Sequence, residues 1–323
     1  MDWSSGSRAI LSSDRTKTMS VYVGRRTWRW DASQLPWFDR PDSSQRLQAR
    51  RKAERLGDEE FELLRHWVAD GYAVASGVVP ESDIDAMERD LDDVWSADRP
   101  HAGLDLLGVR LDANGAVANL THAQLLGIGM PERLEVRHRS NWRIHGFHRF
   151  SAAAAAVFNN TVVTRLASLI LGTPAAPSYT INFTHGSEQG LHQDTAVFHV
   201  APPNFLVGAW LACEDISPDA GPLIVYPGSH RTPMFSEFDD YPQTNLRTSP
   251  SPGRYDDFMR EISRRYEPKT FLARKGEVLL WHGMLIHGGS PVVDRTRSRR
   301  SHVCHYIPPG MNVAEKIEGP FNW

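Results

Sequence analysis

Cysteine is nearly absent from this chain of 323 residues, which contains only Cys213 and Cys304. Two cysteines are too few for a disulfide framework of the kind that stabilises small secreted domains. Both lie among apolar residues, so we expect two buried free thiols. The fold must therefore be stabilised by a packed core, which a chain of this length is able to bury.

The chain also lacks a strong excess of charge of either sign. Its formal net charge is −3, so nothing draws the whole protein toward nucleic acid or an anionic membrane surface. No apolar run approaches the roughly 20 residues that span a bilayer, and residues 1–20 lack the apolar core of a signal peptide. We expect a cytoplasmic protein that acts on a small molecule and binds neither nucleic acid nor membrane, and the sequence leaves its oligomeric state open.

The amino-terminal half is predicted to be mostly helical. Residues 1–45 are polar and are expected to form a loose tail, which docks partly through Trp28, Trp30, Trp37 and Phe38. The remainder, residues 46–323, is expected to form a single domain that begins with a helical part over residues 46–175. Apolar spacing and capping signals predict helices over Ser44–Gly57, over Asp58–Asp70, after a capping box at Ser82–Asp85, and from Ser151 to Leu171.

The pattern changes to short strands in residues 176–310. Six runs are rich in β-branched and aromatic residues: Tyr179–Thr184, Asp194–Val200, Leu206–Cys213, Leu223–Tyr226, Glu277–His282 and His302–Ile307. Short strands without intervening helices favour an antiparallel sandwich or jelly roll. A polar insertion over residues 231–269 is predicted to be helical near Asp256–Tyr266. It lies between two parts of the chain that contain candidate site residues, where a lid or substrate loop would be useful. Residues 311–323 are expected to form a carboxy-terminal tail.

The stretch Gly190–Thr195 contains the strongest chemical signal. In an extended segment, residues two apart project to the same side, so His192 and Asp194 can bind one metal ion together. A third ligand is required, and His287 is the best candidate, with His282 as its competitor in the same segment. Two imidazoles and one carboxylate on one face of Fe(II) leave three positions open, which suits an enzyme that activates O2.

Such an oxygenase needs a reductant, commonly 2-oxoglutarate, whose far carboxylate requires a buried cation. The planar fork of an arginine provides two hydrogen bonds to a carboxylate. The run Asp294–His302 contains Arg297, Arg299 and Arg300. Alternation places Arg299 and Arg300 on opposite faces of the strand that follows, so only one of them can point inward.

An ordered set of motifs resembles the phytanoyl-CoA dioxygenase family. The motifs are Leu191-His192-Gln193-Asp194, Val207-Gly208-Ala209-Trp210, Gly221–His230, Lys275–His282 and His287-Gly288-Gly289-Ser290, and the resemblance covers roughly residues 140–310. It implies a mainly β fold with flanking helices: a double-stranded β-helix (jelly roll, cupin-like) core with an N-terminal helical extension. It also implies Fe(II), 2-oxoglutarate and O2 as cofactor and cosubstrates.

The same resemblance implies roles for particular residues. His192, Asp194 and His287 are then the iron ligands and catalytic residues. Arg299 is the arginine of the cosubstrate, with Arg297 and Arg300 as alternatives, while Gln193, Trp210 and Asn182 line the cosubstrate pocket. Halogenases of the family carry a small residue in place of the carboxylate, so Asp194 favours hydroxylation over halogenation.

The expected reaction is hydroxylation, or a related oxidation, of an unactivated C–H bond, with release of succinate and CO2. Two other functions fit the same fold: a metal-binding module without catalysis, and a metal-dependent hydrolase or isomerase on a cupin-like barrel. Four aromatic residues suggest a substrate with an apolar portion: Trp142, Phe147, Phe150 and Phe198. Four histidines could line the substrate pocket or be hydrogen-bonded core residues: His145, His148, His199 and His305.

Overall fold

The computed structural model describes residues 20–313, apart from residues 24–25, 30–31, 113–114, 116, 239–240, 242–244 and 247–251. The α-helices in this part of the chain are α1 (Ser43–Ala53), α2 (Asp58–Asp70), α3 (Glu81–Asp93), α4 (His122–Leu126), α5 (Met130–Arg139), α6 (Ala152–Phe158), α7 (Thr161–Leu171) and α8 (Pro252–Ser263). The strands are β1 (Ser20–Val23), β2 (Arg26–Arg29), β3 (Tyr72–Ala75), β4 (Asp105–Arg110), β5 (Val117–Thr121), β6 (Arg143–His145), β7 (Ala176–Phe183), β8 (Val200–Ala201), β9 (Val207–Ala212), β10 (Leu223–Val225), β11 (Lys269–Phe271), β12 (Val278–His282), β13 (His287–Gly289), β14 (Ser301–Ile307) and β15 (Asn312–Val313).

Two antiparallel sheets form the centre of the protein. The large sheet has eight strands in the order β3-β12-β9-β14-β7-β6-β4-β5, and the small sheet has the order β11-β10-β13. The chain crosses repeatedly between the sheets, because β9 and β12 belong to the large one while β10 and β13 belong to the small one. This arrangement confirms the predicted jelly roll, a mainly β fold with flanking helices.

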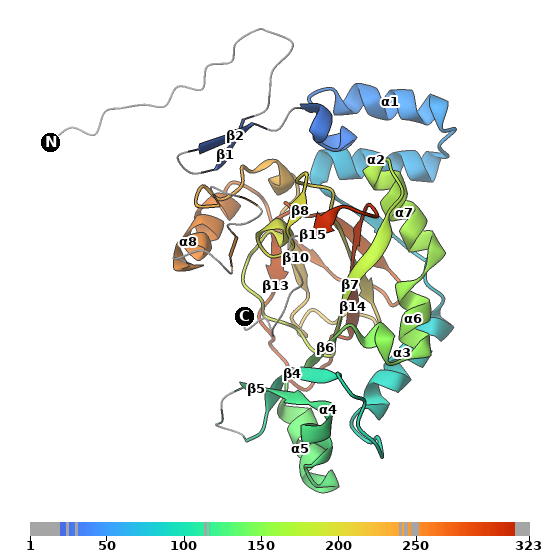
Figure 1. Cartoon of the computed structure of the whole chain (residues 1–323), viewed down its shortest axis with the longest axis vertical. Coiled ribbons are helices and arrows are strands. Elements are labelled where there is room, and N and C mark those ends of the chain that lie inside the picture. The colour runs from blue at the N-terminus through green and yellow to red at the C-terminus, as the bar shows by residue number, and fades with distance from the viewer. Residues whose placement is uncertain are drawn as a thin grey trace, which may run out of the picture.

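Helices cover the large sheet on the side away from the small sheet. Figure 1 shows α3, α6 and α7 stacked along that side, with α1 and α2 above them and α4 and α5 below. The helices and the sheet share one apolar core, which includes Leu64, Met87, Ile144, Leu166 and Leu280. A separate core fills the space between the two sheets and includes Trp210, Leu223, Leu279, Trp281 and Val303.

The predicted helix from Ser151 to Leu171 is two helices. The chain breaks at Asn159 and Asn160, and the Asn160 side chain accepts a hydrogen bond from the Val163 amide at 2.9 Å, which caps α7. By length and composition the whole stretch Ala152–Leu171 could cross a membrane, which corrects the expectation that no apolar run is long enough. In this structure its apolar face packs into the core that the helices share with the large sheet.

Two local predictions are wrong. The residue before α3 is Pro80, which offers no side-chain cap, so Ser82 does not form the predicted capping box. The predicted strand Asp194–Val200 is instead a 3-10 turn, η4 (Asp194–Ala196), followed by the two-residue strand β8. The amides of Val197 and Phe198 donate to the carbonyl oxygen of Asp194, and these turn bonds replace a strand ladder.

The described part of the insertion over residues 231–269 is packed rather than loose. Its helix α8 contributes Tyr255 and Met259 to an apolar cluster that also contains Ala196 and Val197. The Tyr255 hydroxyl accepts a hydrogen bond from the Gln193 amide at 3.0 Å. The insertion therefore supports the segment His192–Asp194 directly.

The amino-terminal segment is anchored at one aromatic pair. Trp37 and Phe38 are buried, and Trp37 Nε1 donates to the Ile170 carbonyl at 2.7 Å. Residues 1–19 and Trp30 of the predicted tail, and residues 314–323 at the other end, lie outside the described residues. Both cysteines are free and buried, as predicted.

Candidate metal centre

His192, Asp194 and His287 converge in the space between the two sheets. Gln193 has extended backbone angles, φ −114° and ψ 132°, so its two neighbours project to the same side. His287 begins β13 and pairs with His192 in an antiparallel bridge with N···O distances of 2.9 and 3.0 Å. One potential ligand atom from each of the three residues lies within 4.8 Å of the other two. The structure therefore brings together the three side chains that the sequence predicted as a metal site.

Backbone carbonyls orient both imidazoles. Nδ1 of His192 lies 2.9 Å from the Gly190 carbonyl, and Nδ1 of His287 lies 2.9 Å from the Leu285 carbonyl. Nδ1 must therefore carry the proton in each ring, which leaves Nε2 with a lone pair. Both Nε2 atoms lie 3.5 Å from Oδ1 of Asp194. Burial lowers the pKa of His287 to about 4, so this ring is neutral at pH 7, as a metal ligand must be.

The second oxygen of Asp194 is held by two donors. Trp281 Nε1 donates to Oδ2 at 2.7 Å, and His305 Nε2 lies 2.9 Å from the same atom. Burial acts to raise the pKa of Asp194, but the imidazoles of His287 and His305 outweigh it and hold the pKa well below its usual range. The carboxylate is thus ionised, with Oδ2 occupied and Oδ1 directed between the two imidazoles. This donor set fits a divalent transition metal bound through one carboxylate oxygen and two imidazole nitrogens.

A glycine makes the Trp281 contact possible. Trp281 lies on β12 directly opposite Gly208 of β9. A Cβ atom at position 208 would lie 2.2 Å from the Trp281 ring, so any larger residue would displace the indole. Because Gly208 has no side chain, the Trp281 ring can occupy the space over it and donate its hydrogen bond to Asp194.

Arg299 enters the same cavity from the segment just before β14. It is 2% exposed, and its Nε and Nη1 atoms have no hydrogen-bond partner among the described residues. The guanidinium lies over the rings of Trp210 and Phe183, with centroid distances of 5.6 and 5.9 Å. Burial lowers its pKa to about 10, so it remains charged at pH 7. Nε1 of Trp210, which also lines the cavity, is likewise buried without a partner in the described part of the chain, so this end of the cavity fits a carboxylate-bearing ligand.

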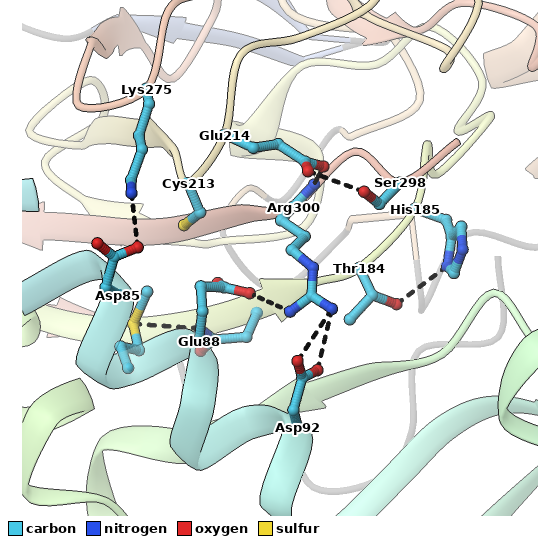
Figure 2. A network of polar contacts seen from close by, with 12 residues as sticks. Asp85, Glu88, Asp92, Thr184, His185, Cys213, Glu214, Lys275, Ser298 and Arg300 are labelled. Carbon is cyan, nitrogen blue, oxygen red and sulfur yellow. Dashed lines mark hydrogen bonds and ion pairs between the residues drawn. The ribbon is translucent and has the colours of Figure 1, made fainter. Parts of the chain in front are cut away.

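The two alternative arginines lie elsewhere. Arg297 is on the surface, where its Nε lies 3.1 Å from Asp294. Arg300 points to the opposite side of the sheet and binds Glu88 of α3 at 2.7 Å, as Figure 2 shows. The structure thus places Arg299 alone of the three in the cavity, in agreement with the predicted alternation.

Two predicted pocket residues point away from the cavity. Asn182 lies on β7 between two inward-facing residues, so its side chain faces the helices, where Nδ2 lies 3.4 Å from the Met87 sulfur. Gln193 lies between the two ligands, so the extended backbone that brings them together sends its side chain the other way, to the Met284 carbonyl at 2.9 Å. Neither residue lines the metal cavity. His282 also lies apart, with Nε2 3.2 Å from Asp39.

The cavity wall differs in part from the aromatic lining predicted from sequence. Of the four predicted aromatics only Phe198 lines it, whereas Trp142 and Phe147 are core residues beneath the helices and Phe150 packs against that core. Of the four histidines, His145 and His305 line the cavity and His148 and His199 do not. The remaining wall includes Arg143, Ile181, Phe183, Gln189 and Val197.

Sequence reasoning did not identify Trp281 as a partner of Asp194, nor Arg143 and Gln189 as wall residues. For Trp281 a signal existed: alternation along Val278–His282 puts Trp281 on the same face as Leu279, toward the space between the sheets. Arg143 and Gln189 lie in segments with weak periodicity. Only the folded chain brings them to the cavity.

Comparison with known proteins supports this picture. A family model described as phytanoyl-CoA dioxygenase (PhyH) matches residues 67–301. The peroxisomal phytanoyl-CoA dioxygenase of Rattus norvegicus is 32% identical over 121 residues, which is 37% of this chain and 33% of that protein. The ectoine dioxygenase of Nocardia farcinica is 28% identical over 169 residues, which is 49% of this chain and 56% of that protein. The matched stretch thus spans about a third to just over half the length of these curated relatives.

Solved structures share the fold at low identity. EctD from S. alaskensis with bound Fe aligns with a TM-score of 0.55 and 16% identity, covering 82% of each chain. The epimerase SnoN, in complex with Fe3+, alpha ketoglutarate and nogalamycin RO, aligns with a TM-score of 0.54 and 14% identity, covering 77% of this chain and 84% of that one. Because the family model spans most of the sequence and includes His192, Asp194 and His287, the chain belongs to the phytanoyl-CoA dioxygenase family.

Proposed function

We propose that this protein is an oxygenase that uses Fe(II), 2-oxoglutarate and O2 to hydroxylate, or otherwise oxidise, an unactivated C–H bond of a small molecule, with release of succinate and CO2. One observation carries the proposal. His192, Asp194 and His287 present one ligand atom each within 4.8 Å of one another, in a cavity that also contains the buried guanidinium of Arg299. The first feature fits iron, and the second fits the far carboxylate of the cosubstrate.

The three ligand residues would hold the iron through Nε2 of each histidine and Oδ1 of Asp194. The iron, when bound, supplies the redox chemistry that activates O2. The chain itself supplies the orientation of the ligands. The Gly190 and Leu285 carbonyls fix the two imidazoles, and Trp281 and His305 occupy the other carboxylate oxygen. These contacts would hold the three ligand atoms in place when the metal binds.

Arg299 would bind the C5 carboxylate of 2-oxoglutarate. Two of its guanidinium nitrogens are buried and have no partner among the residues that the structure describes, which is costly unless a ligand accepts their hydrogen bonds. A planar carboxylate is the matching acceptor, and the surrounding rings of Trp210 and Phe183 exclude water. Arg299 therefore selects a cosubstrate that has a second acidic group.

The substrate is proposed to be a small molecule with an apolar portion. Ile181, Val197 and Phe198 contribute apolar side chains to the wall beside the metal site. Hydroxylation is favoured over halogenation because Asp194 occupies the carboxylate position. Two solved structures of the same fold are described as an epimerase and a carbocyclase, so product analysis must establish the outcome at the C–H bond. The cytoplasmic location stays a prediction.

The proposal is tested by measuring succinate formation and O2 uptake in the presence of Fe(II), 2-oxoglutarate and ascorbate. Wild-type protein should convert 2-oxoglutarate slowly even without substrate, and a His287→Ala variant should not. His282→Ala is the matched control, because His282 lies in the same segment and contacts Asp39 instead of the metal site. Activity that zinc supports equally well without 2-oxoglutarate would favour a hydrolase or isomerase. Absence of succinate and O2 uptake in all conditions would favour a metal-binding module without catalysis.

A further inference from the structure

The backbone that carries Arg299 has no regular structure of its own. Residues 298–300 come directly before β14 and lie outside the strand itself, so the paired residues of β14 do not by themselves determine where these side chains point. Arg299 nevertheless directs a charged side chain into a cavity, where its Nε and Nη1 atoms have no hydrogen-bond partner within the described part of the protein. An unconstrained arginine would turn to water or to a carboxylate. Other contacts must therefore hold it.

Glu214 holds both neighbours of Arg299. Oε1 of Glu214 accepts a hydrogen bond from the Arg300 amide at 2.6 Å, and Oε2 accepts one from the Ser298 hydroxyl at 2.8 Å. Glu214 follows β9, the strand that pairs with β14, and Figure 2 shows its carboxylate between Ser298 and Arg300. One side chain thus clamps the segment on either side of the cosubstrate arginine.

Two backbone contacts complete the clamp. The Arg299 amide donates to the Thr184 carbonyl at 3.0 Å, and the Cys213 amide donates to the Arg300 carbonyl at 3.0 Å. The Arg300 side chain leaves toward α3, where it binds Glu88 at 2.7 Å and Asp92 at 3.0 Å. With Arg300 held on the helix side, alternation directs Arg299 into the cavity.

The charge of Glu214 also acts on Arg299. Burial lowers the pKa of Arg299, and the negative charge of Glu214 opposes this effect. Glu214 lies outside the cavity wall, so it does not compete with a ligand for the guanidinium. Glu214 thus stabilises the cation from outside the cavity, and the Nε and Nη1 atoms of Arg299 remain available to a ligand.

We propose that Glu214 is a positioning residue for 2-oxoglutarate: by clamping Ser298 and Arg300 it keeps Arg299 aimed into the metal cavity and sets the preference for a diacid over a monoacid cosubstrate. This inference rests on the proposed function of the cavity. It assigns a role to a residue that touches neither the metal site nor the cosubstrate.

The experiment compares two ligands on the Mn(II)-loaded protein by calorimetry. 2-Oxoglutarate has the C5 carboxylate, and 2-oxobutyrate chelates a metal in the same way but lacks it. Glu214→Ala should weaken 2-oxoglutarate binding about tenfold, since it removes two charge-assisted hydrogen bonds that fix the arginine, and should leave 2-oxobutyrate within about twofold. Glu214→Gln keeps an acceptor for the Arg300 amide but removes the charge, so its loss should be about threefold.

Glu277 provides a matched control. It also accepts a backbone amide, that of Arg274 at 2.9 Å, and a serine hydroxyl, that of Ser76 at 3.3 Å, in the turn before β12. Glu277→Ala should leave the ratio of the two affinities unchanged. Thermal unfolding of each variant establishes that it is folded. If Glu214→Ala does not fold, the affinities of Glu214→Gln test the positioning role.

The outcomes separate the two proposals. Equal weakening of both ligands, or of neither, in the Glu214 variants would overturn the positioning role. An Arg299→Ala variant must lose the preference for the diacid. If Arg299→Ala loses this preference and the Glu214 variants keep it, the positioning role alone fails. If Arg299→Ala keeps the preference, the assignment of the cosubstrate arginine fails, and the role of Glu214 fails with it.

Discussion

Arg299 and Arg300 are neighbours in the sequence, yet they serve opposite faces of the large sheet. On the cavity face, toward the small sheet, Nε and Nη1 of Arg299 and Nε1 of Trp210 are buried without a partner among the described residues. On the helix face, toward α3, the Arg300 guanidinium is matched by the carboxylates of Glu88 and Asp92. In the described part of the chain, the same residue type therefore has two unpartnered nitrogens on one face and is paired with two carboxylates on the other.

This difference indicates where the protein binds ligands. A buried donor without a partner costs about 1–3 kcal/mol, so a fold tolerates it where a ligand will accept the hydrogen bond. The helix face differs in its charged groups: its partly buried cation, Arg300, is paired within the protein by Glu88 and Asp92. We therefore expect substitutions on the cavity face to alter binding and substitutions on the helix face to alter stability. Four predictions test this division, in order of decreasing effect on function.

The largest effect is expected for His287→Ala. Loss of one of three ligands should lower succinate formation roughly 1,000-fold or more, because the iron is no longer held in a geometry that activates O2. The addition of Fe(II) without oxygen should raise the melting temperature of the wild type and not that of the variant. A variant that keeps a tenth of the wild-type activity would remove His287 from the metal site.

The two arginines provide the sharpest test of the comparison. Arg299→Met should weaken 2-oxoglutarate binding roughly 100-fold, or about 3 kcal/mol, while the free energy of unfolding stays the same or rises, because a buried cation is removed. Arg300→Met should lower the free energy of unfolding by about 2–3 kcal/mol, because it leaves the buried carboxylate of Glu88 without its cation, whereas Asp92 keeps Arg137. Calorimetry and urea unfolding measure the two effects. The division of roles fails if both variants show the same pattern.

Trp281→Phe tests the support of Asp194. The variant keeps the aromatic packing against Gly208 but removes the donor to Oδ2, so metal affinity should fall about 10- to 100-fold. Trp95→Phe is the matched control on the helix face, because Trp95 is equally buried and its Nε1 has no hydrogen-bond partner. Titration with Fe(II) in the absence of oxygen should separate the two tryptophans, and equal affinities would show that the Trp281 contact has no effect on the metal.

The smallest functional effect is expected for Asn182→Ala. Its side chain lies on the helix face, where Oδ1 is 3.3 Å from Nδ1 of His302. Removal should lower the free energy of unfolding by about 1–2 kcal/mol, because it leaves a buried polar group of His302 without its partner. The affinity for 2-oxoglutarate should stay within about twofold of wild type. A tenfold loss would instead place Asn182 in the cosubstrate site.

Local patterns predicted much of the fold, because the signals concerned are local. The apolar spacing over Asp58–Asp70 predicted α2 with both ends correct, since Gly71 ends the helix in a left-handed conformation. The run Leu206–Cys213 differs from β9 by one residue at each end. Prediction failed at η4, where β-branched and aromatic residues favour a strand but the Asp194 carbonyl accepts two amide hydrogen bonds in a turn. It also failed at Asn159 and Asn160, where a cap inside an apolar stretch divides the helix.

For the candidate site, the sequence by itself determined the chemical types present and the pairing of His192 with Asp194. That pairing depends only on the alternation of an extended backbone, which is a local property. The tertiary structure decided everything that depends on distant contacts. The bridge between His192 and His287 brings the third ligand into place, and the contacts on each side of Arg299 determine which arginine faces the cavity. These choices are nonlocal because the two sheets meet only after the chain has crossed between them.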